Sequence, residues 1–106
     1  MGFARFSIFT SMERNAAIIK VRDAIQDANG WVVEQTFFSN IASTINFELP
    51  ATSLNTFQDQ LRAGGLTVYV DGDLPDTGTS KDVRATISLT FSHDEPDLKR
   101  QVPPFG

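Results

Sequence analysis

The stretch NAAIIKVRDAIQDANGWVVEQTFFSNIASTINF, residues 15–47, contains a predicted helix followed by two predicted strands. Its first half places apolar residues at spacings of three and four, which is typical of one buried helix face. They are Ala17, Ile18, Val21, Ala24, Ile25 and Ala28. Asn29 and Gly30 are expected to end this helix, because glycine tolerates the left-handed conformation common at helix ends. The residues beyond them predict a hairpin with strands over 31–38 and 44–49.

Residues 3–10 precede this stretch with alternating apolar and polar side chains, which predict a strand with one buried face. Residues 10–13, with the sequence Thr-Ser-Met-Glu, match a capping box. In such a box a hydroxyl and a carboxylate bind the free N–H groups at a helix start. The first helix is therefore expected over 12–28.

The rest of the chain repeats the same succession of elements. Pro50 is expected to end the hairpin, and a second helix with apolar residues at helical spacing ends at the Gly-Gly pair of 64–65. A fourth strand is predicted over 66–70 and a fifth over 83–91, where the alternation is the cleanest in the chain. The fifth strand is expected to lie antiparallel beside the fourth, after a polar loop at 71–82.

This order of elements, β-α-β-β-α-β with one extra C-terminal strand, predicts an α+β fold of the ferredoxin-like kind. Its sheet is expected to be antiparallel, and right-handed crossovers would place both helices on one face. One domain is predicted over 1–92, followed by an extended tail over 93–106. The other face of the sheet is expected to be uncovered and to carry Arg5, Ser7, Phe9, Thr44, Asn46, Glu48, Thr67 and Tyr69.

Composition limits the classes of function. The chain has 106 residues, no cysteine and a net charge of -4. Its nine Lys and Arg residues are scattered, which argues against nucleic acid as a partner because phosphate binding requires clustered basic side chains. No apolar run is long enough to span a membrane, and no thiolate is present for a disulfide or a thiolate metal site. A cytoplasmic protein without a cofactor or metal is expected, with neither membrane nor nucleic acid as a partner.

The arrangement is similar to that of ACT domains, small regulatory modules that bind amino acids or related ligands at subunit interfaces. The resemblance rests on the helix that ends at residues 29–30, the strand over 31–38, its hairpin partner over 44–49, and a second helix that closes on Ala-Gly-Gly-Leu at 63–66. It covers about residues 3–71. The resemblance implies a regulatory module that binds an amino acid or a related small metabolite at a dimer interface.

The turn between the first strand and the first helix is the candidate ligand site. Its residues are Thr10, Ser11, Met12 and Arg14. Free N–H groups at a helix start attract a carboxylate or a phosphate, and Arg14 adds positive charge. The alternative is a plain helix cap, in which Glu13 already supplies the negative charge.

Side chains predicted on or near the uncovered face form the candidate interface. They are Phe9, Val32, Phe38 and Tyr69. A large exposed apolar patch usually marks an interaction surface, and identical chains commonly associate through one shared surface. A homodimer through the sheet face or a sheet edge is therefore expected. A platform for a small ligand and simple exposure of these side chains are the alternatives.

Three functions remain open. The favoured one is a small ligand-binding or regulatory module without catalytic residues. The second is a cofactor-free enzyme similar to the dimeric α/β-barrel monooxygenases and isomerases, which predicts a cavity near Phe9, Phe38 and Tyr69 with His93 or a carboxylate reaching into it. The third is a structural subunit of a larger assembly that uses residues 102–105 as an arm.

Overall fold

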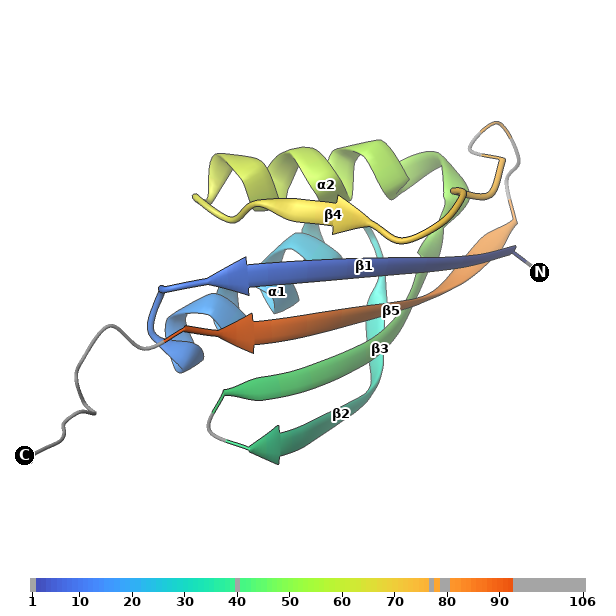
Figure 1. Cartoon of the computed structure of the whole chain (residues 1–106). Coiled ribbons are helices and arrows are strands. Elements are labelled where there is room, and N and C mark those ends of the chain that lie inside the picture. The colour runs from blue at the N-terminus through green and yellow to red at the C-terminus, as the bar shows by residue number, and fades with distance from the viewer. Residues whose placement is uncertain (1, 40, 77, 79–80, 93–106) are drawn as a thin grey trace, which may run out of the picture.

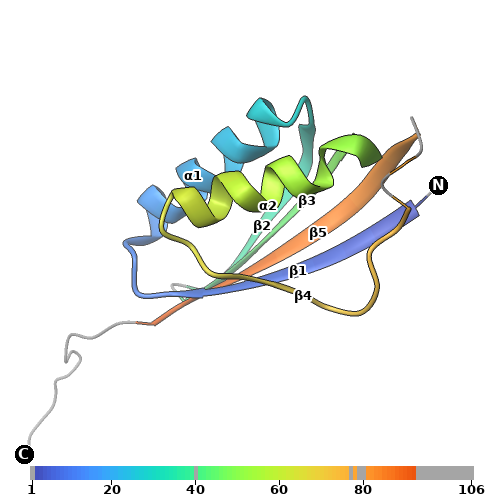
Figure 2. The same cartoon turned by 90° about the horizontal axis from the view of Figure 1, so that it is seen from above.

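The structure is a computed structural model that describes residues 2–39, 41–76, 78 and 81–92. It contains a five-stranded mixed sheet and two α-helices (Figure 1), which confirms the predicted α+β class. In chain order the elements are β1 (Gly2–Thr10), α1 (Arg14–Asp27), β2 (Trp31–Ser39), β3 (Ala42–Pro50), the 3₁₀ turn η1 (Ala51–Ser53), α2 (Leu54–Ala63), β4 (Val68–Val70) and β5 (Asp82–Phe91). Figure 2 shows both helices on the same face of the sheet, as the sequence predicts.

The fifth strand lies in the middle of the sheet, so the predicted position beside β4 is wrong. The strand order is β2-β3-β5-β1-β4. β5 pairs in parallel with β1 and antiparallel with β3 along its whole length, and Figure 1 shows it between them. β1 and β3, which are neighbours in a ferredoxin-like sheet, are therefore separated. The sheet is mixed rather than antiparallel, and the ferredoxin-like order is not confirmed.

The length of β4 gives a physical reason for this placement. β4 has 3 residues, whereas β5 has 10. An edge position beside β4 would leave most backbone groups of β5 without a strand partner, and buried unpaired backbone groups are costly. β1 and β3 have 9 residues each, so between them the backbone groups on both sides of β5 find strand partners.

The core lies between the sheet and the helices. Every second side chain of β5 points into it, as the alternation predicts: Val83, Ala85, Ile87, Leu89 and Phe91 are all buried. Phe57 of α2 joins the helix layer to the strands, because its ring centroid lies 5.5 Å from that of Phe6 and 5.0 Å from that of Phe47. α1 contributes the predicted stripe, in which Ala17, Val21 and Ile25 are fully buried.

Helix α1 begins at Arg14, two residues later than predicted, because Glu13 is its N-cap. The Glu13 carboxylate accepts hydrogen bonds from the backbone N–H of Asn15 at 2.8 Å and of Ala16 at 3.1 Å. The hydroxyl of Thr10 accepts one from the N–H of Met12 at 3.0 Å, outside the helix. The predicted capping box is therefore wrong. A single carboxylate caps the helix, and those two backbone hydrogen bonds lower the pKa of Glu13 below its usual 4.5.

Replacing this cap should destabilise the fold only where the carboxylate is charged. We expect Glu13→Gln to lower the midpoint of thermal unfolding slightly at neutral pH, because the folded state holds the ionised carboxylate better than the unfolded chain does. The difference from wild type should shrink as the pH falls below about 4.5 through the lowered folded-state pKa, since protonation removes the same charge from wild type. Asp23→Asn removes a carboxylate from the exposed side of α1, away from the helix start, and is the matched control; its unfolding midpoint at neutral pH should stay close to that of wild type. A loss that persists unchanged at pH 2 would contradict the assignment.

The end of α1 also differs in detail from the prediction. Asn29, not Gly30, adopts the left-handed conformation, with a φ of 64°. Gly30 is required for a different reason: a Cβ at this position would lie 2.6 Å from the backbone oxygen of Glu48 and 2.9 Å from the Cβ of Leu49. A side chain at position 30 would therefore push β3 away from the end of the helix.

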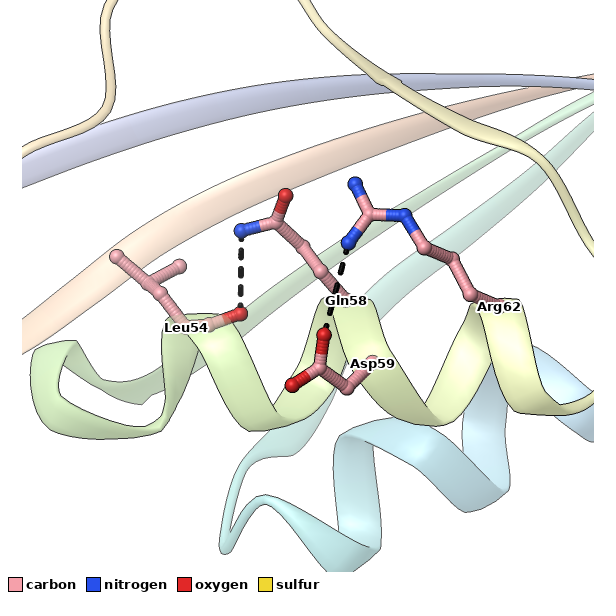
Figure 3. Close-up of polar contacts among 4 residues, drawn as sticks. All are labelled: Leu54, Gln58, Asp59 and Arg62. Atoms are coloured by element: carbon pink, nitrogen blue, oxygen red, sulfur yellow. Dashed lines mark hydrogen bonds and ion pairs between the residues drawn. The ribbon is translucent and has the colours of Figure 1, made fainter.

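Polar contacts on α2 are local to that helix (Figure 3). The buried Gln58 donates a hydrogen bond from Nε2 to the backbone oxygen of Leu54 at 3.3 Å. Arg62 and Asp59 form an ion pair at 3.6 Å, and both side chains are more than half exposed. Exposed pairs of this kind contribute little to stability. α2 therefore serves mainly to bring Phe57 and its apolar neighbours onto the sheet.

Candidate binding face

The face of the sheet opposite the helices carries side chains in rows that cross neighbouring strands. The strand registers define four rows, which together we call the uncovered face. The first row is Trp31, Glu48, Arg84 and Phe3; the second is Glu34, Asn46, Thr86 and Arg5; the third is Thr36, Thr44, Ser88, Ser7 and Tyr69; the fourth is Ser39, Ala42, Thr90 and Phe9. The residues predicted for this face lie in these rows, except Thr67, which precedes β4.

Charge is distributed unevenly over the uncovered face. Charged side chains occur in the first and second rows, where Arg5 and Arg84 balance Glu34 and Glu48. Arg84 and Glu48 form an ion pair with 3.2 Å between Nη2 and Oε2. The third and fourth rows consist of hydroxyl, methyl and aromatic side chains. The rows are therefore neutral in sum, although the chain has a net charge of -4.

A groove of about 320 Å³ crosses the charged half of this face. Phe3 of β1 and Val33 of β2 form apolar walls, and each is about half exposed, at 45% and 54%. Asn46 and Thr86 lie between them and are joined by a hydrogen bond of 2.8 Å from the Thr86 hydroxyl. Arg84 also lines the groove. Apolar walls around a few polar groups are the usual composition of a small-molecule site.

A β-bulge brings Glu34 onto the same face as Val33. The register between β2 and β3 shifts between Val32 and Glu34, so Val33 is an extra residue in β2. A bulge breaks the strict alternation of a strand, so side chains beyond it change sides. Sequence reasoning missed the groove for this reason, because strict alternation places Trp31, Val33 and Phe37 on one side of the strand and Glu34 on the other. The structure instead pairs Phe37 with Ser43 on the helix side, under the guanidinium of Arg14.

At the other end of β1 the structure brings two predicted interface residues together. The rings of Phe9 and Tyr69 meet edge to face, with 6.1 Å between their centroids. Both side chains are exposed. Next to them, the Ser7 hydroxyl donates a 2.6 Å hydrogen bond to the carboxylate of Asp71, which follows β4. This corner of the uncovered face is therefore an aromatic pair beside a fixed carboxylate.

Val32 and Phe38 do not join that pair. Val32 is paired with the buried Phe47, so it lies on the helix side and packs against the core. Phe38 lies in β2, at the opposite edge of the sheet, where the register shifts a second time, and its side chain is 67% exposed. The cavity that the enzyme hypothesis expects around Phe9, Phe38 and Tyr69 would have to span the whole sheet.

The predicted ligand turn is largely occupied by its own hydrogen bonds. The Glu13 carboxylate holds the N–H groups of Asn15 and Ala16, where a bound anion would lie, and an anionic ligand would meet its negative charge. Arg14 extends over Phe37, with 5.8 Å between the guanidinium carbon and the ring centroid. Ser11 is exposed, and Met12 packs against the core. This geometry favours the helix cap, the alternative that the sequence leaves open.

Other features give no stronger candidate. Clefts of about 290 and 350 Å³ lie beside α1, one against α2 and one against the start of β2, and charged or polar side chains line much of both. Within the described part of the chain, no group of three His, Asp or Glu side chains is placed to hold a metal ion. Among the same residues, no helix combines the length and apolar character needed to cross a bilayer. His93 and the 102–105 arm lie outside the described residues.

No model of a protein family, no curated protein and no solved structure matches this chain. The class of the protein therefore rests on its own fold and surface: within the described residues, it is a small α+β domain whose mixed sheet has both helices on one face. The ACT-domain resemblance remains a prediction from the sequence.

Proposed function

We propose that this chain is a small, non-catalytic binding module that acts through the uncovered face of its sheet. The groove between Phe3 and Val33 supports the proposal, because side chains from β1, β2, β3 and β5 converge there. A rigid sheet holds such side chains in fixed positions more precisely than a loop does.

The groove favours a small metabolite with an apolar body and charged ends. Its volume of about 320 Å³ lies at the lower limit of typical ligand pockets, which are about 300–1,000 Å³. An apolar body would lie between Phe3 and Val33, while Arg84 would bind a carboxylate and Glu34 an ammonium group. An amino acid with an apolar side chain has this combination of groups. A regulatory role would follow if the bound ligand changed the surface that the uncovered face presents.

A thermal-shift screen against apolar and aromatic amino acids and related acids tests the proposal. A ligand at about a hundred times its dissociation constant stabilises a protein by about 2.7 kcal/mol, and each kcal/mol raises the unfolding midpoint of a domain this size by roughly 4–8 °C. We expect one class of these compounds to raise the midpoint, and Phe3→Ala or Val33→Ala to abolish the shift.

Phe37→Ala is the matched control for the screen. Phe37 is about as exposed as Phe3 and Val33, at 56%, but it lies on the helix side of β2. This variant should keep the full ligand shift. The proposal fails if no compound in the screen stabilises the protein, or if the shift survives in Phe3→Ala and Val33→Ala.

A further inference from the structure

The uncovered face is large enough to form a stable interface. β1, β2 and β3 have 9 residues each. At about 3.3 Å per residue and about 4.8 Å between strands, the four long strands form a face of roughly 30 by 19 Å, and the 3 residues of β4 bring the total to about 600 Å². This lies at the lower end of the roughly 600–1,000 Å² that a stable protein interface buries on each partner. An occupant therefore has to cover nearly the whole face, which a second sheet does by packing about 10 Å above it.

The charges on the face are compatible with a second copy of the same chain. In its rows, Arg5 and Arg84 offset Glu34 and Glu48, and the Asp71 carboxylate beside Ser7 leaves each face with a single net negative charge, so two faces repel each other much less than two chains of net charge -4 otherwise would. The charged rows and the uncharged rows also occupy opposite halves of the face. One half can therefore cover the other half in a neighbouring copy.

We propose that a second copy covers the uncovered face, with the strands of the two sheets antiparallel. The twofold axis lies between the sheets and crosses the strands at the level of Phe6, Ile45 and Ile87, which separates the second row from the third. The first row then lies over the partner's fourth row, and the second row over the partner's third. Phe3 meets the partner's Phe9, and the charged rows meet hydroxyl groups, which can bond to them.

A specific ion pair supports this orientation. Asp71 lies beside Arg5 of its own chain, because its N–H donates a 2.9 Å hydrogen bond to the Arg5 backbone oxygen, and its carboxylate reaches the Ser7 hydroxyl at the level of the third row. That row faces the partner's second row, which contains Arg5. In the single chain the Arg5 guanidinium carbon lies 5.3 Å from the centroid of the Phe3 ring, so in the dimer the guanidinium turns from Phe3 toward the partner's Asp71, and the twofold axis produces this pair twice.

The other face-to-face arrangement is unfavourable. If the axis ran along the strands, β5, the central strand of the sheet, would lie over its own copy. Arg84 would then face the partner's Arg84, and like charges placed directly opposite each other are destabilising. The antiparallel arrangement avoids this contact. This inference goes beyond the proposed function, because the dimer forms without a ligand; it also encloses the groove between the two subunits, so a ligand in the groove would bind at the interface.

Sedimentation equilibrium of the wild-type chain and a charged variant tests the dimer. Wild type should have twice the chain mass of 11.7 kDa. Ser88→Arg, in the third row of β5, should sediment as a folded monomer. Gln26→Arg adds the same charge on the helix side and should remain a dimer. A folded wild-type monomer, or a Ser88→Arg variant that remains a dimer, would overturn the proposal. The uncovered face would then be expected to bind a different protein.

A charge exchange tests the orientation. Arg5→Asp alone should weaken the dimer by about tenfold or more, because it places two carboxylates together. The double variant Arg5→Asp with Asp71→Arg should recover most of that loss, since it reverses the pair. A double variant that is no tighter than Arg5→Asp would overturn the antiparallel arrangement. The thermal-shift screen measures ligand binding independently of oligomeric state. A monomeric chain that still binds a compound in the groove would therefore contradict the dimer but not the proposed function.

Discussion

A chain that ends after Lys81 should not fold. It lacks β5, and with it the strand that joins β1 to β3. The remaining strands would form a β1–β4 pair and a β2–β3 hairpin, and isolated two-stranded units are marginal in water. We expect circular dichroism to show no cooperative thermal transition for this chain.

A chain that ends after Ser92 is the control, because it keeps every described strand. It should unfold cooperatively, with a midpoint close to that of the full chain. If the chain that ends after Lys81 kept a cooperative transition, β5 could not be the central strand. That outcome would instead favour the edge position that the sequence predicts.

Phe57→Ala should cause a large loss of stability. Phe57 is fully buried and contacts Phe6 and Phe47, so its removal leaves a cavity where α2 meets β1 and β3. Substitutions of this type cost about 3–5 kcal/mol, against a total of about 5–15 kcal/mol for a typical domain. Equilibrium unfolding in urea measures the difference in the free energy of unfolding.

Two further variants make that measurement decisive. Phe57→Leu keeps most of the buried volume and should cost less, about 1–2 kcal/mol, so it reports on packing even if Phe57→Ala does not fold. Ile19→Ala removes an apolar side chain that is 57% exposed on α1 and should change stability by less than about 0.5 kcal/mol. Equal losses for Ile19→Ala and Phe57→Ala would contradict the position of the core.

Periodicity identified the buried faces because burial depends mainly on local spacing. The α1 stripe of Ala17, Val21 and Ile25 is buried as predicted, and so are the alternate residues of β5 from Val83 to Phe91. These patterns indicate which side of a helix or strand faces the core. The predicted end of α1 agrees with the structure for the same reason, although Asn29 rather than Gly30 takes the left-handed conformation.

The neighbours of each strand could not be predicted in the same way. An edge strand and a central strand can show the same alternation, so the pattern of β5 could not distinguish β4 from β1 and β3 as its partners. The bulge at Val33 leaves no mark in the residue types, yet it places Glu34 beside Val33 in the groove and moves Phe37 to the helix side. At the candidate turn, the hydrogen bonds of Glu13 depend on backbone geometry that the Thr-Ser-Met-Glu sequence does not specify.

The central position of β5 also bears on how the chain is made. Arg84 pairs with Phe3, so the middle of the sheet joins residues from opposite ends of the described chain. During synthesis β1 and β3 leave the ribosome long before β5, and until then each has an open edge that can pair with other chains. The high sequence separation of these contacts also slows folding. The sheet is therefore expected to form after translation has passed residue 91, and chaperones that shield open strand edges should matter most during that interval.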